Sequence, residues 1–199
     1  MFVIGLTGGI GTGKTRVSEM LGALGAAIVN ADLLGHRVYA PQSEGWREVV
    51  DEFGREGLTP DGEIDRRKLG PIVFGDPEAL QKLNAIAHPK IYKLAEESIK
   101  KLAEQGREVA VLEAALLIEA KWTPLVDEVW VTVAPEQDVV RRIQERNGLD
   151  EEAIRSRTAA QMSQDERVAH ADVVVNNAGD LNELRNKIQE LWDSRVTAR

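Results

Sequence analysis

The segment Gly8–Thr15, which reads GGIGTGKT, restricts the fold of this chain more than any other feature. It matches the pattern G-x-x-x-x-G-K-[ST] at every fixed position. The short apolar run Phe2–Leu6 precedes it, and in Lys14–Leu24 apolar residues recur at helical spacing. A strand, a glycine loop and a helix in this order are the context that a phosphate-binding loop requires. We therefore interpret the segment as such a loop, rather than as a glycine-rich turn with an exposed lysine.

Phosphate binding follows from the chemistry of this loop. Glycines allow backbone N–H groups to approach phosphates closely, and the first turn of the following helix adds a positive dipole end. Lys14 supplies a mobile positive charge for the β- and γ-phosphate oxygens, and the Thr15 hydroxyl is placed to bind Mg²⁺. The sequence thus predicts ATP as a substrate and Mg²⁺ as the cofactor.

Four further apolar runs alternate with helical patterns, and they cover residues 26–30, 109–112, 129–133 and 172–175. With the first run they predict an α/β fold of the P-loop NTPase class, in which helices flank a five-stranded parallel sheet. The stretch 33–105 is too long for a plain crossover and predicts an inserted helical substrate domain. Residues 135–170 are rich in Arg and Glu and predict a lid. The nucleotide-binding core then consists of residues 1–32, 106–134 and 171–199.

The position of Asp32 favours a kinase over a GTPase switch. Residues 32–35 spell D-x-x-G, but they follow Lys14 too closely to leave room for a switch loop, and no N-K-x-D segment occurs. Asp32 follows the second strand, which we expect beside the P-loop strand, where ligands bind at the carboxyl ends of parallel strands. We predict that it accepts the proton of an acceptor hydroxyl or orients that hydroxyl. The alternative is that Asp32 caps a helix that starts near Leu33.

Two glutamates lie at and beyond the end of the third predicted strand. Glu113 follows Val109–Leu112 directly, so we predict that it holds Mg²⁺, either directly or through water. Glu119 is interpreted as a surface or capping residue.

The predicted lid concentrates arginines in an otherwise acidic chain: Arg141, Arg142, Arg146, Arg155 and Arg157. Arg142 and Arg146 are four positions apart, so on a helix they share a face and could clamp a triphosphate. The alternative for any one of them is pairing with a nearby glutamate on a solvated helix.

The histidines give weaker signals. His88 precedes Pro89, and since the residue before a proline is disfavoured in a helix, we interpret His88 as a helix-ending residue with a satisfied ring. The alternative is a residue that faces a ligand. His36 and His170 have no metal-ligand spacing with other residues, so no zinc site is predicted.

Composition and charge exclude several classes of binding partner. The net charge of −8 opposes nucleic-acid binding, and the absence of cysteine excludes disulfides and thiolate metal sites. No apolar run is long enough to span a bilayer and no basic leader opens the chain, so we expect a cytoplasmic location without membrane association. No obligate protein partner is predicted.

Several segments together resemble the dephospho-CoA kinase family over nearly the whole chain. In chain order they are Leu6–Thr15, Asn30–Asp32, Asp65-Arg66 with Leu69 and Val73-Phe74, His88-Pro89, Arg142–Arg146, Gln161, and Ala171-Asp172 with Asn176. The resemblance implies transfer of the ATP γ-phosphate to the 3′-hydroxyl of dephospho-CoA, in a fold made of a nucleotide-binding core, a helical CoA domain and a lid. ATP and dephospho-CoA are then the expected ligands.

The resemblance also implies roles for single residues. The expected ATP-binding residues are Gly11, Thr12, Gly13, Lys14, Thr15, Arg16, Arg142, Arg146 and Arg157. The expected catalytic residues are Lys14, Arg142 and the base Asp32. Asp32, His88 and Arg66 are expected to contact the acceptor substrate.

Three positions depart from the usual pattern of the family. Asn30 with Asp32 stands where the family usually has two aspartates, so only Asp32 can act as a base. Glu113 with Ala114 and Ala115 stands where the family commonly has Asp-x-Pro or Val-Pro, which leaves the metal role of this position in doubt. Arg16 replaces the usual threonine after the P-loop hydroxyl residue. None of these changes removes a group that phosphoryl transfer needs.

Two other functions stay open at the level of sequence. Another P-loop metabolite kinase, such as a nucleoside monophosphate kinase, could recruit Arg66, Arg67 and Lys68 to an acceptor phosphate. A noncatalytic nucleotide-binding module is the second alternative, which Asp32 disfavours because a switch needs no acceptor-side base.

Overall fold

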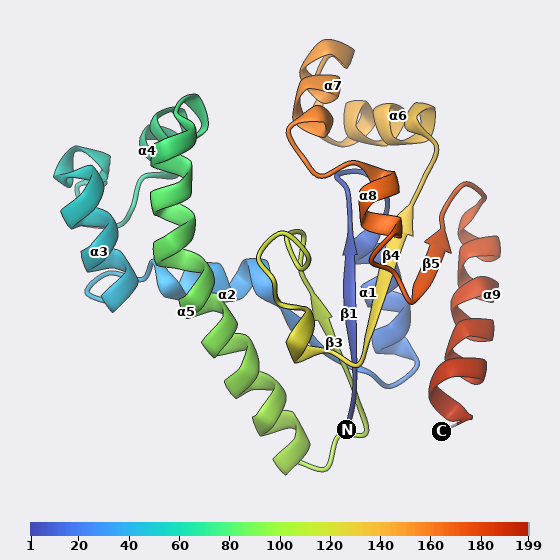
Figure 1. Cartoon of the computed structure of the whole chain (residues 1–199). Coiled ribbons are helices and arrows are strands. Elements are labelled where there is room, and N and C mark those ends of the chain that lie inside the picture. Colours follow the sequence, from blue (N-terminus) through green and yellow to red (C-terminus); the bar gives the residue numbers. More distant parts are fainter. Residues whose placement is uncertain (199) are drawn as a thin grey trace. The chain divides into compact units, whose positions relative to one another are not determined.

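Five parallel strands form one sheet in the order β2-β3-β1-β4-β5 within the part of the chain that this computed structural model describes, residues 1–198 (Figure 1). The side chains of Arg66 and Phe74 also lie outside the description. The strands are β1 (Phe2–Gly8), β2 (Ala27–Asn30), β3 (Val109–Glu113), β4 (Glu128–Val133) and β5 (Val173–Asn176). The prediction of a five-stranded parallel sheet flanked by helices is confirmed.

The P-loop strand β1 lies at the centre of the sheet. It pairs with β3 through Ile4 and Val111 and with β4 through Leu6 and Trp130. All residues of β1 are buried, because helices cover both faces of a parallel sheet, and this explains the continuous apolar run in the sequence.

The expectation that the second strand lies beside the P-loop strand is wrong, because β3 lies between β1 and β2. The crossover through α1 (Lys14–Ala23) carries the chain past one strand position, and β3 enters this position after the long helical stretch. Asn30 at the end of β2 is therefore paired with Glu113 of β3.

One core lies between the sheet and the helices α1 and α9 (Leu181–Trp192). Ile4, Leu6, Leu21 and Trp130 are each fully buried in it. A short turn η2 (Thr123–Leu125) precedes β4, and a π-helical turn η3 (Asp193–Thr197) follows α9. Burial of each such large side chain contributes about 1.5–3 kcal/mol, so this core holds the loop between β1 and α1 on a rigid base.

Three helices follow β4, and they are α6 (Glu136–Asn147), α7 (Glu151–Ala159) and α8 (Gln164–Val168). Helices α6 and α7 lie beyond the carboxyl end of the sheet, and α8 lies beside the end of β4 (Figure 1). Val139 and Ile143 of α6 and Ile154 of α7 form a small core with Ala134. The arginine-rich segment is thus a packed helical element with its own apolar contacts.

The chain divides into two compact units. One comprises Met1–Asn30 and the chain from Ile99 onward, and the other comprises Ala31–Ser98. The second unit contains α2 (Ala31–Val38), α3 (Glu44–Phe53), the turn η1 (Arg55–Gly57), α4 (Arg66–Gly75) and most of α5 (Pro77–Glu104). Val49, Leu69, Val73 and Ala79 form its core. The predicted three-part division into core, substrate domain and lid stays a prediction.

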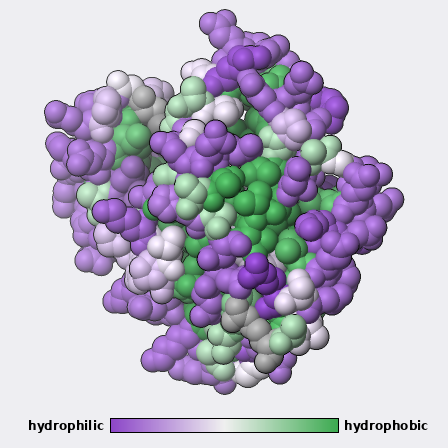
Figure 2. All heavy atoms as spheres, turned by 45° about the vertical axis from the view of Figure 1, so that its right-hand side comes forward, coloured by the Kyte–Doolittle hydropathy of each residue, from purple (hydrophilic) through white to green (hydrophobic). Residues whose placement is uncertain are grey.

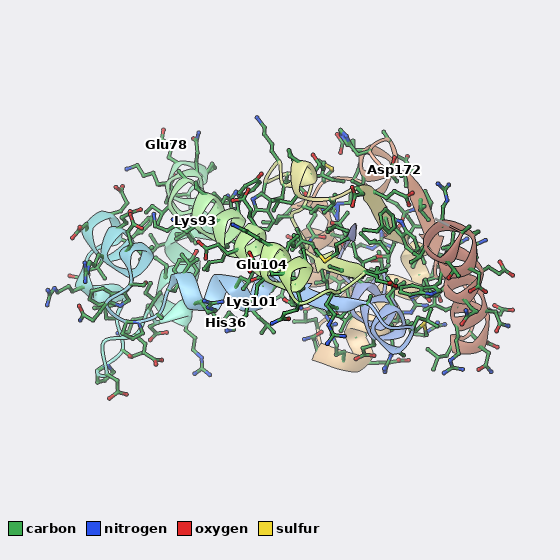
Figure 3. The ribbon with its side chains drawn as sticks, turned by 90° about the horizontal axis from the view of Figure 1, so that it is seen from below. His36, Glu78, Lys93, Lys101, Glu104 and Asp172 are labelled. Carbon is green, nitrogen blue, oxygen red and sulfur yellow. The ribbon has the colours of Figure 1, made fainter. Side chains whose placement is uncertain are left out.

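The interpretation of His88 as a helix-ending residue is wrong, because α5 continues for 28 residues with Pro89 inside it. A proline in a helix interior costs about 3 kcal/mol or more, since it removes a backbone donor and crowds the preceding turn. Ala87 and Ala95 are buried on this helix, so tertiary packing offsets the local preference. Figure 3 shows charged side chains along α5, among them Glu78, Lys93, Lys101 and Glu104.

Hydrophilic residues cover most of the surface in the view of Figure 2, and the largest group of hydrophobic residues lies in its centre. Among the helices of the described chain, none has the length and apolar character that crossing a membrane requires.

Candidate active site

The P-loop connects the buried end of β1 to the first turn of α1. Gly11 and Gly13 adopt φ values of 76° and 97°, a region that glycine enters without strain. The Thr12 side chain points inward: its hydroxyl donates to the Gly9 carbonyl at 2.8 Å and lies 2.7 Å from the Thr132 hydroxyl of β4. The Thr12 side chain therefore holds the loop conformation from its inner side.

A second brace comes from the segment after β5. The Asn177 side-chain amide donates to the Thr12 carbonyl at 2.8 Å, and Asn177 is buried. Neither Thr132 nor Asn177 was predicted as a site residue, because neither carries a sequence pattern that links it to the P-loop. Their position at the ends of neighbouring strands is the only signal that could have found them.

Gly13→Ala is expected to be more damaging than Gly25→Ala, although both glycines have positive φ. A Cβ on Gly13 would lie 2.1 Å from Asn177 Nδ2, whereas a Cβ on Gly25 meets nothing within 4 Å. Gly25→Ala should therefore cost only backbone strain, about 1–2 kcal/mol of unfolding free energy, and leave ADP binding intact. Gly13→Ala should cost more and weaken ADP binding. Urea denaturation and ADP titration of the two variants test this, and equal losses would contradict it.

Glu113 and Thr15 meet at the end of β3. The Thr15 hydroxyl donates to Glu113 Oε1 at 3.2 Å, and Asn30 Nδ2 donates to Glu113 Oε2 at 3.3 Å. The structure thus brings together both residues predicted to hold the metal. A hydroxyl and a carboxylate are oxygen ligands of the kind that Mg²⁺ prefers. Among the described residues no three His, Cys, Asp or Glu side chains cluster as a metal site.

Two predicted clamp residues share a cavity with the P-loop. The cavity, of about 450 Å³, is lined by P-loop residues, by Lys14 and Thr15, and by Arg142 and Arg146 of α6. The Arg142 guanidinium donates from Nη2 to the Asn177 carbonyl at 2.9 Å, and its buried Nη1 has no hydrogen-bond partner among the described residues. This free donor beside the P-loop is placed to bind an anionic ligand.

The other arginines differ in their surroundings. Arg16 lines the same cavity, but its guanidinium pairs with Glu19 at 2.8 Å and both side chains are exposed. Arg157 is an exposed residue of α7 and is not among the described residues that line this cavity. Arg141 pairs with Asp138, and Arg155 pairs with Glu136 and Glu151, so the solvated-helix interpretation holds for these two.

The interpretation of Glu119 as a surface or capping residue is wrong. Its Oε1 accepts a hydrogen bond from Nη2 of Arg167 in α8, and only 1% of the Arg167 side chain is exposed. Near this pair, Gln161 Oε1 accepts a hydrogen bond from the Ile10 N–H of the P-loop at 3.0 Å. Arginine is rarely fully buried, so its sequence position gave no reason to expect this pair.

The predicted acceptor-side residues belong to the second unit. Asp32 is exposed in the first turn of α2, which begins at Ala31, so it lies within the helix rather than at its cap. His88 is half-buried on α5. The Arg66 side chain lies outside the described residues. His36 is an exposed residue of α2 (Figure 3).

The His88 environment predicts a pH dependence of stability. Burial lowers the pKa of His88 from its ordinary value of 6.5. The unfolded chain then binds this proton more readily than the folded chain, so the contribution is present above pH 6.5 and is lost as the pH falls through the folded pKa. Acidification from about pH 7.5 to about pH 5.5 should therefore lower the urea midpoint less in His88→Gln than in the unaltered protein. Identical pH profiles would contradict the prediction.

Comparisons of sequence and of structure with known proteins all point to the same family. The family model described as dephospho-CoA kinase matches residues 2–183. A dephospho-CoA kinase of Carboxydothermus hydrogenoformans is 45% identical over 94% of this chain and 90% of its own length. One of Geobacter sulfurreducens is 45% identical over 98% of this chain and 99% of its own. A solved structure of the Campylobacter jejuni dephospho-CoA kinase has a TM-score of 0.74 at 25% identity and covers 98% of both chains.

Proposed function

The chain belongs to the dephospho-CoA kinase family, and we propose that it transfers the γ-phosphoryl group of ATP to the 3′-hydroxyl of dephospho-CoA. The residues that carry out this transfer are those of the P-loop together with Arg142, Glu113 and Asp32. Membership of this family makes the chain an ATP-dependent kinase. The observation that carries the assignment of the donor site is the single cavity shared by Lys14, Thr15, Arg142 and Arg146.

The P-loop binds the donor. Its backbone N–H groups and the first turn of α1 hold the β-phosphate, and Lys14 approaches the β- and γ-phosphate oxygens. Arg142 and Arg146 contact the triphosphate from α6, where the free Nη1 of Arg142 gains a partner. These fixed positive groups stabilise the charge that develops on the transferred group.

Thr15 and Glu113 would hold Mg²⁺, Thr15 through its hydroxyl and Glu113 through a carboxylate oxygen or a water molecule. When bound, the ion supplies charge neutralisation on the β- and γ-phosphate oxygens. Asn30 keeps the Glu113 carboxylate oriented by its hydrogen bond to Oε2.

Asp32 acts on the acceptor. It accepts the proton of the 3′-hydroxyl while the hydroxyl oxygen bonds to the γ-phosphorus. The bond between the γ-phosphorus and the bridging oxygen breaks, and ADP leaves with that oxygen. His88 contacts the acceptor in the neutral form, since burial lowers its pKa. Arg66 is proposed as a further acceptor contact, and Arg157 as a further contact to the nucleotide.

A coupled assay of ADP release tests this function. ATP and Mg²⁺ are supplied with dephospho-CoA, AMP, CMP or no acceptor, and the product is identified by mass. Release that requires dephospho-CoA and yields coenzyme A supports the proposal. A preference for AMP or CMP would indicate that the acceptor is a nucleoside monophosphate rather than dephospho-CoA. ADP release without any acceptor would indicate an ATPase or a nucleotide-dependent switch.

A further inference from the structure

A second cavity adjoins the P-loop and has no role in the function described above. It has a volume of about 250 Å³ and shares Gly9 and Ile10 with the larger nucleotide cavity. Its walls include the apolar side chains of Val131, Val139 and Met162. The only fully buried cationic side chain among its described lining residues is that of Arg167.

Two nitrogen atoms of the Arg167 guanidinium have no hydrogen-bond partner among the described residues. Its Nη2 donates to Glu119, but Nε and Nη1 are buried and have no partner among the described residues. An arginine paired with a carboxylate commonly uses two parallel donors, whereas this pair uses one carboxylate oxygen. A buried guanidinium with unused donors is costly, so the protein retains it at the expense of stability. Such donors are suited to oxygen atoms of a ligand.

The unpartnered Nη1 of Arg167 lies close to the P-loop at Gly9. A Cβ built on Gly9 would lie 3.9 Å from Arg167 Nη1 and 3.6 Å from Gln161 Oε1. The hydrogen bond from the Ile10 N–H to Gln161 Oε1 connects the segment before α8 to the loop, and it keeps Gly9 close to Arg167 Nη1. A group that extends from the nucleotide cavity past Gly9 therefore meets the donors of Arg167.

We propose that Arg167 is a catalytic residue that binds non-bridging oxygens of the ATP γ-phosphoryl group beside Gly9, where the second cavity meets the nucleotide cavity. The inference rests on the proposed use of ATP as the donor. The cavity presents donors to an acceptor-rich group, and its apolar walls strengthen the attraction between the guanidinium and the phosphoryl oxygens. Glu119 holds the guanidinium in place through its hydrogen bond from Nη2. No bond forms to Arg167 during transfer.

Nucleotide binding without any acceptor tests the proposal. The double variant Arg167→Met and Glu119→Leu removes the donors without leaving a buried charge, because apolar side chains of similar volume can replace a buried ion pair without loss of stability. ADP and the non-hydrolysable analogue AMP-PNP are titrated by calorimetry with Mg²⁺. We expect AMP-PNP affinity to fall about tenfold to hundredfold while ADP affinity stays unchanged, since ADP lacks the γ-phosphoryl group.

An equal loss for ADP and AMP-PNP would overturn the proposal, because a purely structural role of the ion pair affects both nucleotides. No loss for either would overturn it as well. Since no acceptor is present, the result is independent of whether dephospho-CoA is the substrate.

Gly9→Ala provides an independent test that leaves the ion pair intact. Its Cβ would stand at ordinary contact distance from Gln161 and Arg167, and Gly9 is not among the glycines with positive φ, so the fold should tolerate it. The added methyl group would occupy the space between the loop and Arg167. We expect AMP-PNP affinity to fall, and unchanged AMP-PNP affinity would contradict the placement of the γ-phosphoryl group beside Gly9.

Discussion

Replacing Asp32 by Asn is expected to lower turnover by about 10²–10⁴-fold while ATP affinity stays unchanged. The variant keeps the size of the side chain but removes the proton acceptor, and the P-loop that binds ATP is untouched. Because Asp32 is exposed in the first turn of α2, loss of its charge should cost no more than about 1 kcal/mol of unfolding free energy. Steady-state kinetics with saturating dephospho-CoA and calorimetric titration with ATP measure the two effects separately.

Asp76→Asn is a matched control for this variant. Asp76 also lies at the start of a helix of the second unit, where its side chain accepts a hydrogen bond from the Glu78 N–H. Asn is a helix cap of similar quality, so turnover should not change. Undiminished turnover in Asp32→Asn would show that Asp32 only stabilises α2.

Lys14→Ala is expected to lose nucleotide binding and turnover together. Removing one charged donor aimed at the transferred group costs about 10²–10³-fold in turnover, and the weaker contact to the β-phosphate also lowers ADP affinity. Lys14 is the first residue of α1, where a positive side chain is opposed by the helix dipole. The alanine variant should therefore unfold at the same or a higher urea concentration. Turnover, ADP titration and urea denaturation together check the prediction.

Lys101→Ala on the exposed face of α5 serves as the control for loss of one lysine charge (Figure 3). It should change neither ADP affinity nor turnover. If Lys14→Ala also lowered stability, the loss of binding would reflect a damaged loop rather than a missing charge, and the assignment of Lys14 to the phosphates would fail.

Local sequence patterns predicted the strands and helices well, because buried positions are occupied by apolar residues at the spacing of the strand or helix. The run of apolar residues after Met1 marks β1, whose residues are buried on both faces, and helical spacing after Lys14 marks α1. The order of the strands leaves no such pattern. Nothing in residues 27–30 indicates that β3, formed about eighty residues later along the chain, would lie between β2 and β1.

Packing also overrode two local rules. Proline disfavours a helix interior, yet α5 continues through Pro89 because the helix packs through Ala87 and Ala95. Charged side chains are mostly exposed, yet Arg167 is fully buried beside the P-loop with Glu119 as its partner. Glu119 lies 48 positions from Arg167 along the chain, so local sequence patterns could not reveal this pair.

The sequence by itself determined the phosphate-binding loop and the class of fold, because the glycines, Lys14 and Thr15 stand next to one another in the chain and act through local geometry. Only the tertiary structure decided which distant groups surround that loop. Arg142 and Asn177 on one side, and Gln161 and Arg167 on the other, reach it through strand order and helix packing. The hydrogen bonds of Asn177 and Gln161 to the loop join residues more than a hundred positions apart, and periodicity and spacing carry no information about such pairs.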